Sequence, residues 1–303
     1  MNTALTVPNP LEPIQLLVLN AVSSPLTRTM YGVALTDFFG WWNQQGRPEF
    51  NRATVQAYRV TLETRHLSAA TINQKLSAIR KLASEALYNK LLDATTAQGI
   101  REVHGAKMQG TRTGNWLPKA KAERLVNTPD TATLKGKRDR AILMLMIGCG
   151  LRREEVARVT LDHIQERDGR WCVVDLIGKH GRVRTIPMPP WAKVAIDTWT
   201  AAANVTAGPV FRGVNKGDHV TGESLSSQGV ARCVADYSKK LKLQVSAHDL
   251  RRTHAKLAYS NGAKLDQIQL ALGHASLVTT ERYLGTHQNL TDAPADYLHL
   301  NFD

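Results

Sequence analysis

The sequence has no long apolar segment and no recognisable leader. The longest uninterrupted apolar run among its 303 residues covers 141–147, far short of the roughly 20 residues that a membrane-spanning helix needs. The N-terminus has no basic region, and Pro8, Pro10 and Pro13 interrupt it, which is not typical of a signal peptide. We therefore expect a cytoplasmic protein that does not enter a membrane.

Cysteine is scarce, and the sequence contains no motif of a metal centre. Cys149, Cys172 and Cys233 are odd in number, and no two of them form a Cys-x-x-Cys pair. They are expected to be free thiols in a reducing compartment. None of the ten histidines has a partner four residues away, which is the spacing of a helical zinc site. The sequence thus predicts no metal site, and we expect no cofactor.

Acidic residues are few relative to basic ones. Lys and Arg total 39 against 26 Asp and Glu, which gives a formal charge of +13. The excess is spread along the chain, because residues 1–110 carry 11 basic and 7 acidic residues and residues 111–303 carry 28 and 19. This favours a polyanionic partner, nucleic acid first and an anionic membrane second. Charge alone leaves open a basic protein with no special partner.

The first third of the chain is predicted to form a compact helical domain. Ser24-Pro25 is typical of a helix start, since serine caps the N-terminus and proline fits the first turn. Apolar residues then recur at helical spacing as far as Gly46-Arg47-Pro48, which ends the helix. Further helices are predicted over residues 53–65, from Ser68 onward, and over about residues 91–102.

The second half of the chain combines helices with a β-hairpin. Residues 105–118 are rich in glycine and are interpreted as a linker. Two β-rich runs, 171–177 and 183–188, are joined by Gly178-Lys-His-Gly-Arg, which predicts a hairpin with a basic tip. Helical patterns occur before and after this hairpin, the last of them near residues 278–283.

Four short patterns in the second half combine charged and hydroxyl-bearing side chains. They are Gly150-Leu-Arg152-Arg153-Glu154-Glu155, Lys179 at the hairpin tip, His248-Asp-Leu-Arg251, and Leu272-Gly-His274 followed by Tyr283. Taken singly, each pattern is more often structural, as a solvated helix face, a turn lysine, a chance pair or a core tyrosine. Taken together, they supply the parts of one phosphate-handling site.

The paired residues fit the recognition of a phosphodiester. Arg152 and Glu155, like His248 and Arg251, are three positions apart, so each pair shares a helix face. Two guanidinium groups and an imidazole match the nonbridging oxygens of one phosphate. These cations can stabilise the developing charge without a metal.

The other polar residues fit covalent catalysis. Tyr283 offers a phenol oxygen as a nucleophile that can hold a phosphoryl intermediate. Lys179 on the hairpin is a suitable general acid for the departing alkoxide. His274 adds a hydrogen-bond donor to the same phosphate.

These motifs make the chain resemble the tyrosine recombinase (phage integrase) family over nearly its whole length. The series Gly-Leu-Arg, Gly-Lys, His-x-Leu-Arg, Leu-Gly-His and Tyr occurs in the family's order and at similar spacing. The first part is similar to the family's core-binding domain, including Thr29-x-Tyr31-x-x-x-Leu35-x-x-Phe38 and Leu67-Ser-x-x-Thr71-Ile-Asn. Without a long N-terminal arm-binding domain, the chain is more similar to the simple integrases and Xer-type recombinases.

The resemblance implies a mainly α fold with a small β-sheet or hairpin, arranged in two domains. A helical, SAM-like core-binding domain that binds DNA is expected over residues 24–104. A mixed α/β catalytic domain is expected over residues 119–285. Residues 1–23 are then an N-terminal extension, residues 105–118 the linker, and residues 286–303 a tail that is exchanged between protomers.

The same resemblance implies a role for each candidate site residue. Arg152 is the first catalytic arginine, and Glu155 is the acidic residue that supports it. The other catalytic residues implied are Lys179, His248, Arg251, His274 and the nucleophile Tyr283. The hairpin lacks the second lysine frequent in related chains, so Lys179 is the only lysine candidate there. Arg153 adjoins Arg152, but the Gly-Leu-Arg register favours Arg152.

The implied activity is site-specific recombination or integration of DNA, as in mobile elements. The enzyme would cut and rejoin double-stranded recombination sites through a 3′-phosphotyrosyl link, without metal or ATP. The resemblance also implies a nucleoid-associated homo-tetramer on two DNA sites, formed by exchange of the C-terminal tails. Two alternatives are a type IB topoisomerase, which relaxes DNA as a monomer, and a non-catalytic DNA-binding protein.

Overall fold

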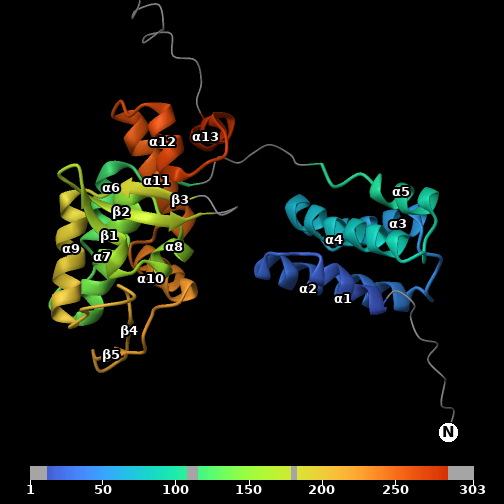
Figure 1. Ribbon diagram of the computed structural model, residues 1–303, viewed down its shortest axis with the longest axis horizontal. Coiled ribbons are helices and arrows are strands. Elements are labelled where there is room, and N and C mark those ends of the chain that lie inside the picture. Colours follow the sequence, from blue (N-terminus) through green and yellow to red (C-terminus); the bar gives the residue numbers. More distant parts are fainter. Residues whose placement is uncertain (1–11, 108–114, 179–182, 286–303) are drawn as a thin grey trace, which may run out of the picture. The chain divides into compact units, whose positions relative to one another are not determined.

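The computed structural model describes residues 12–107, 115–178 and 183–285, and it divides the chain into two units. The first unit covers Met1–Thr111 and the second covers Arg112–Asp303. Both are mainly helical, and the second also contains small antiparallel sheets (Figure 1). Among the described helices, none combines the length and apolar character needed to cross a membrane.

The first unit consists of helices in its described part. They are α1 (Glu12–Asn20), α2 (Pro25–Gln44), α3 (Arg52–Thr64), α4 (Ala69–Tyr88) and α5 (Ala94–Arg101). Side chains cap four of the helix starts, because the last four helices begin after Ser24, Asn51, Ser68 and Asp93 and each side chain accepts a backbone N–H of the first turn. The predicted helix starts at Ser24 and Ser68 are confirmed.

The core of the first unit contains packed aromatic rings, and a network of hydrogen bonds to Asp37 lies beside them. Phe38 of α2 packs edge-on against the Tyr58 ring of α3 at a centroid distance of 5.1 Å. The Tyr58 hydroxyl donates to Asp37 at 2.5 Å, and Lys75 and Arg65 pair with the same carboxylate at 2.9 and 3.1 Å. These hydrogen bonds tie α2, α3 and α4 together, and they hold the Asp37 pKa below its usual value although burial raises it.

The N-terminal extension expected over residues 1–23 is partly wrong, because helix α1 belongs to the first unit. Residues 1–11 lie outside the described part, but residues 12–20 form a helix whose Ile14 and Val18 are buried in the core of the first unit. These two residues are four positions apart, so they share the helix face that packs against α4. The core of the first unit therefore begins earlier than residue 24.

The second unit surrounds a central buried helix. Its helices are α6 (Lys119–Val126), α7 (Leu134–Cys149), α8 (Arg153–Arg158), α9 (Pro190–Ala202), α10 (Ser227–Lys240), α11 (Ala247–Ser260), α12 (Leu265–Leu272) and α13 (Leu277–Leu284). Residues 141–146 of α7 are buried on every face, because α6, α9 and α11 all pack against this helix. The apolar run of the sequence is therefore a core helix.

A three-stranded antiparallel sheet supplies the predicted hairpin. Its strands are β1 (Ile164–Arg167), β2 (Arg170–Ile177) and β3 (Val183–Pro187), in that order. Asp168 and Gly169 both have positive φ and form the tight turn between the first two strands. A bulge near Asp175 shifts the register of the next pair, so that Leu176 lies opposite Arg184. A short 3₁₀ turn (Leu161–His163) precedes the sheet, and a small ladder pairs β4 (Gly213–Val214) with β5 (Val220–Thr221).

The segment expected to be a linker, residues 105–118, is held by hydrogen bonds at both of its described ends. Asn73 donates to the Ala106 carbonyl at 3.0 Å, so the chain still packs on α4 after α5 has ended. Leu117 is already buried in the second unit, and its N–H donates to the Thr253 hydroxyl of α11 at 2.9 Å. Backbone and side-chain hydrogen bonds therefore anchor both ends of the segment over residues 105–118.

Candidate active site

The Gly150-Leu151-Arg152 motif turns the chain sharply between α7 and α8. Gly150 ends α7 in the left-handed conformation, with φ of 60°. A Cβ at this position would lie 2.7 Å from the His254 ring, so backbone conformation and space both require glycine. Leu151 is then buried, and Arg152 occupies the N-terminal cap of α8.

Glu155 holds Arg152 at the start of this helix. One carboxylate oxygen accepts from Arg152 Nη1 at 2.8 Å, and the other accepts from the Arg152 backbone N–H at 2.8 Å. Burial raises the Glu155 pKa, but hydrogen bonds from Arg184 and from the Arg152 backbone outweigh this effect and hold the pKa below its usual value. Glu155 is therefore ionised at neutral pH. The Arg152 side chain is 31% exposed, so part of its guanidinium remains accessible.

Arg251 of α11 is buried, and its guanidinium donates to backbone carbonyls at the ends of two helices. Its Nη1 donates to the Gly150 carbonyl at 2.6 Å, and its Nη2 donates to the Leu272 carbonyl. These carbonyls lie at the C-termini of α7 and α12, where helices leave acceptors unused. Burial, followed by the charge of Arg152, lowers the Arg251 pKa to about 10, so the group is still cationic at neutral pH.

Tyr283 of α13 lies between two histidines. Its ring centroid is 5.6 Å from that of His248 and 5.1 Å from that of His274, and both contacts are edge-on. Its hydroxyl donates to the His248 carbonyl at 3.5 Å. The Arg252 guanidinium lies 4.8 Å from the face of the tyrosine ring. The candidate nucleophile is thus seated against the arginine and histidine motifs of its own chain.

The cationic surroundings set the protonation of the site. Burial and then the charges of Arg251 and Arg152 lower the His274 pKa to about 4, so this imidazole is neutral at neutral pH. Its Nδ1 lies 3.0 Å from the Thr280 hydroxyl, and when that hydroxyl donates, Nε2 carries the hydrogen. Burial raises the Tyr283 pKa and the neighbouring arginines lower it, with burial the stronger effect. The phenol is therefore protonated before it reacts.

The structure brings together six of the seven predicted site residues. Contacts connect Arg152 to Glu155 and both His248 and His274 to Tyr283, and Arg251 shares the Leu272 carbonyl with Arg152. Lys179 lies outside the described residues. In residues 12–107, 115–178 and 183–285, no group of three or more His, Cys, Asp or Glu side chains is arranged to hold a metal.

Two residues of the site were missed in the sequence. Arg184 of β3 donates to Glu155 Oε2 at 2.8 Å, and Arg252 stacks on Tyr283. The strand pattern indicates an inward-facing position for Arg184, because residues two apart in a strand share a face and Ile186 is buried. Arg252 has no such signal, since an arginine beside Arg251 is equally compatible with an exposed helix face.

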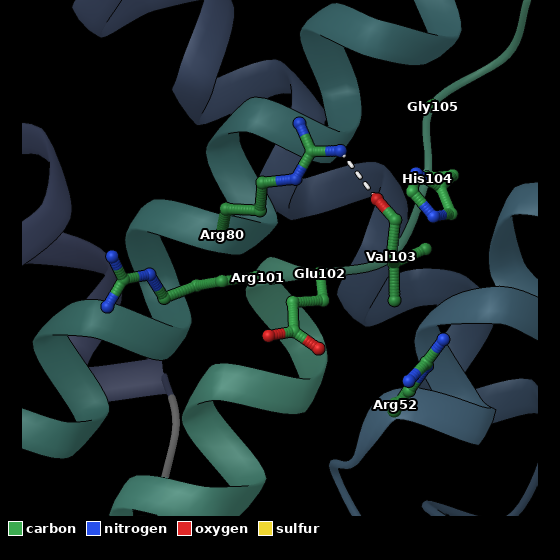
Figure 2. A pocket seen from close by; sticks show the side chains of 7 residues that line it. All are labelled: Arg52, Arg80, Arg101, Glu102, Val103, His104 and Gly105. Atoms are coloured by element: carbon green, nitrogen blue, oxygen red, sulfur yellow. Dashed lines mark hydrogen bonds between the residues drawn. The ribbon is translucent and has the colours of Figure 1, made fainter.

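The first unit carries a cationic pocket of about 370 Å³. Figure 2 shows Arg52, Arg80, Arg101 and His104 around it, with Arg80 directed at the Val103 carbonyl, to which it donates at 2.6 Å. Among the described residues, none of the three arginines forms an ion pair with a carboxylate. Glu102 also lines the pocket, and its carboxylate accepts from Gln98. Because three arginines and one carboxylate line it, the pocket has a net positive charge and suits an anion such as a backbone phosphate.

Two family profiles match the chain in the same order as the two units. The profile of the phage integrase family matches residues 115–289. The profile described as the phage integrase N-terminal SAM-like domain matches residues 14–90. The first of these covers more than half of the chain and contains all seven candidate site residues.

Curated relatives and solved structures agree with these matches. The tyrosine recombinase XerC of Myxococcus xanthus is 30% identical over 273 residues, which is 86% of this chain and 87% of the relative. The XerC of Listeria innocua is 27% identical over 90% of both chains. The structure of XerH bound to its difH substrate has a TM-score of 0.67 at 19% identity, over 93% of this chain and 81% of the other. A lambda integrase dimer bound to a core site has a TM-score of 0.68 at 17% identity, over 90% and 75%.

Proposed function

Because the chain belongs to the phage integrase family and is a tyrosine-type site-specific recombinase, we propose that Tyr283 is the nucleophile that cleaves its DNA. The observation that carries this proposal is the position of the tyrosine ring between His248 and His274, beside the buried Arg251. The phenol oxygen attacks the scissile phosphorus, and the bond from phosphorus to the 5′-oxygen breaks. The products are a 3′-phosphotyrosyl link and a 5′-hydroxyl, and attack by a 5′-hydroxyl of a partner strand reverses the step.

The two motif arginines stabilise the charge on the nonbridging phosphate oxygens. Arg251 is fixed by two helix-end carbonyls and Arg152 by Glu155, so neither has to reorganise when the pentavalent phosphorane forms. Neutral His274 donates a hydrogen bond from Nε2 to the same phosphate. His248, whose pKa burial and the arginines lower, accepts the phenol proton as the Tyr283 oxygen attacks the phosphorus.

Lys179 is proposed as the general acid that protonates the departing 5′-oxygen. This residue lies outside the described part of the chain, and its support is its place between β2 and β3. Arg184 of β3 contacts Glu155, so the strand that follows the lysine is tied to the phosphate-binding residues. Its position in the sequence between these strands and its ammonium group make Lys179 the candidate proton donor.

The proposed substrate is a pair of double-stranded DNA recombination sites. XerH and lambda integrase, to which the chain is similar, are described in complexes with such sites. In this chain, the arginine pocket of the first unit and the candidate active site of the second unit both suit phosphate oxygens. The match to the SAM-like domain favours a recombinase over a type IB topoisomerase, and the assembled site favours an enzyme over a passive DNA-binding protein.

A homo-tetramer on two sites is the proposed assembly, in which each C-terminal tail inserts into a neighbouring protomer. Its support is the sequence of residues 286–303, which lie outside the described part and include Leu290, Leu298, Leu300 and Phe302. Such a head-to-tail contact closes into a ring. A chain without residues 288–303 should bind one site as a monomer and recombine poorly, and recombination at the full-length rate would contradict tail exchange.

Tyr283→Phe tests the nucleophile directly. The substitution removes only the hydroxyl, so folding and DNA binding should persist while the covalent protein–DNA adduct disappears. The measurement is adduct formation on a nicked suicide substrate, followed by denaturing electrophoresis. Tyr259→Phe, at an exposed tyrosine of α11, is the matched control and should form adduct normally. Tyr297, in the C-terminal tail, is the alternative candidate nucleophile, and Tyr297→Phe should therefore form adduct normally. A persistent adduct in Tyr283→Phe would show that the assignment is wrong.

A further inference from the structure

Arg184 joins three structural elements at the candidate active site. It lies on β3, and its side chain is only 9% exposed. Its Nη2 donates to Glu155 Oε2 of α8 at 2.8 Å, and its Nε donates to the Ala271 carbonyl of α12 at 3.1 Å. The strand, the helix that carries Glu155 and the helix that precedes His274 therefore meet at one guanidinium group.

The Leu272-Gly273-His274 motif leaves space for this side chain. Gly273 ends α12 with φ of 60°, and a Cβ there would lie 3.1 Å from Arg184 Cδ and 3.3 Å from its Nε. Any other residue would press on the guanidinium or on its stem. The glycine therefore serves the turn into His274 and also the approach of Arg184 to the end of α12.

Glu155 is shared between two arginines, and this sharing determines the charge that faces the substrate. Arg152 Nη1 contacts one carboxylate oxygen, while Arg184 and the Arg152 backbone N–H contact the other. One negative charge thus stands against two guanidinium groups, which leaves one positive charge uncompensated. Since Arg184 is nearly buried and Arg152 is 31% exposed, the surplus is available on the Arg152 side.

We propose that Arg184 is a positioning residue of the strand-cleavage reaction. Its guanidinium neutralises the charge of Glu155 from the buried side of the carboxylate, so that the charge of Arg152 remains available to the scissile phosphate. Without Arg184, the buried carboxylate would be balanced by Arg152 alone, and the phosphate would meet a neutral pair. This inference rests on the proposed function, since it assigns a role toward the same phosphate.

The test compares Arg184→Met, Arg184→Lys, Glu155→Gln and the double variant Arg184→Met/Glu155→Gln. For each, the rate of adduct formation at saturating DNA, the DNA dissociation constant and the thermal midpoint are measured. Arg184→Met should lower the saturated rate by roughly 10- to 100-fold, the range for losing a residue that orients a primary ligand. The dissociation constant should change little, because many other cations contact the DNA backbone. Arg184→Lys keeps the charge beside Glu155 and should recover most of the rate.

The double variant separates charge balance from simple packing. Glu155→Gln removes the negative charge that captures Arg152, so it should raise the cleavage rate of Arg184→Met. A structural role predicts the opposite, since two buried substitutions should add their defects. Arg138→Met is the matched control: Arg138 is also a buried arginine that pairs with a carboxylate and donates to a backbone carbonyl, but its partners are Asp139 and Arg212. Below its melting temperature it should cleave at the normal saturated rate.

The outcomes separate this inference from the proposed function. A wild-type chain that forms no Tyr283-dependent adduct contradicts the proposed function itself. A wild-type adduct together with an unchanged saturated rate in Arg184→Met overturns only the role of Arg184. The same holds for an Arg184→Met defect that Glu155→Gln deepens. If Arg184→Met does not fold, Arg184→Gln and Arg184→Lys replace it, and equal losses of rate in both overturn the charge argument.

Discussion

Arg251 and Arg152 retain their positive charge in different ways. Arg251 is almost completely buried and donates to two helix-end carbonyls, so its partners are dipoles without net charge. Arg152 is partly exposed and pairs with Glu155, whose charge is shared with Arg184. A buried carboxylate facing Arg251 would cancel its charge, whereas carbonyl oxygens fix its position and leave the charge for the substrate.

Loss of either arginine should slow cleavage, but only one loss should strongly affect stability. Arg152→Ala and Arg251→Ala should each lower the cleavage rate by at least ~100-fold, the scale for one preorganised transition-state donor. Arg251→Ala should also destabilise the second unit by about 1–3 kcal/mol, because the buried Gly150 carbonyl loses its side-chain donor and the Leu272 carbonyl keeps only the longer contact from Arg152 at 3.4 Å. Single-turnover cleavage at saturating DNA and urea unfolding measure the two effects. A variant that binds poorly yet cleaves normally at saturation would contradict this assignment.

The lowered histidine pKa values make the second unit sensitive to mild acid. The unfolded chain binds protons near the ordinary histidine pKa of about 6.5, whereas folded His274 binds its proton only near pH 4. His248 and His254 shift in the same direction, chiefly through burial. Between these values the unfolded state carries more protons, so the contribution of the histidines to stability is complete above pH 6.5 and is lost as the pH falls toward 4.

We therefore expect the urea midpoint of the second unit to fall between pH 7 and pH 5. His274→Asn removes one of the shifted groups and should flatten this dependence. Tryptophan fluorescence during urea titration at several pH values provides the measurement. Parallel curves for the wild type and His274→Asn would show that this histidine contributes nothing to the effect.

At the scale of elements, the site is built from helix ends. The C-termini of α7 and α12 supply the carbonyls for Arg251, and the N-terminus of α8 presents Arg152. Helix α13 is held by a small separate cluster in which Leu284 packs with Ala255, Ile268 and Leu272. A few apolar contacts thus position the nucleophile, and the turns between helices determine the geometry of the charges.

Gly150→Ala should show how strongly the first turn controls the site. The Cβ would have to occupy a left-handed conformation and lie 2.7 Å from the His254 ring. The conformation alone costs roughly 1–2 kcal/mol, and the clash adds to this and displaces the Gly150 carbonyl from Arg251. Both the thermal midpoint and the cleavage rate should therefore fall.

Gly169→Ala is the matched control for this turn. It also has positive φ, at 69°, but no atom lies within 4 Å of its would-be Cβ. It should show only the conformational penalty and keep its cleavage rate once folded. Equal losses of cleavage in both glycine variants would show that the contact with His254 is unimportant.

The sequence predicted best those features that depend only on residues close together in the chain. Serine caps, helical periodicity and the Gly-Leu-Arg and Leu-Gly-His motifs predicted most elements and the residues that meet at the site. Strand β1 was missed although Asp168-Gly169 is a hairpin signal, because its four residues have no apolar alternation. Arg184 was missed because its importance depends on Glu155 and Ala271, which are 29 and 87 positions away.

At the scale of the whole molecule, both units carry positive charge, and the cationic side chains differ in whether a carboxylate pairs with them. Some cations are already balanced within their own helix, as in the pairs Arg59–Glu63 and Lys81–Glu85 of the first unit. Others, such as Arg52 and Arg101 at the pocket of Figure 2, have no carboxylate partner among the described residues. Unbalanced cations should contribute more to DNA binding, because a phosphate does not have to compete with a carboxylate for them.

Salt dependence of binding provides the measurement for this distinction. Each phosphate contact contributes a slope of about −0.9 to the dependence of log K on log salt concentration. If Arg52 and Arg101 each contact one phosphate, the double variant Arg52→Ala/Arg101→Ala should reduce the slope by about 2 while cleavage at saturating DNA stays near normal. The double variant Arg59→Ala/Lys81→Ala removes the same charge from the same unit and should leave the slope nearly unchanged. Equal slopes in the two variants would mean that net charge alone, and not the pocket, governs the contribution of the first unit to binding.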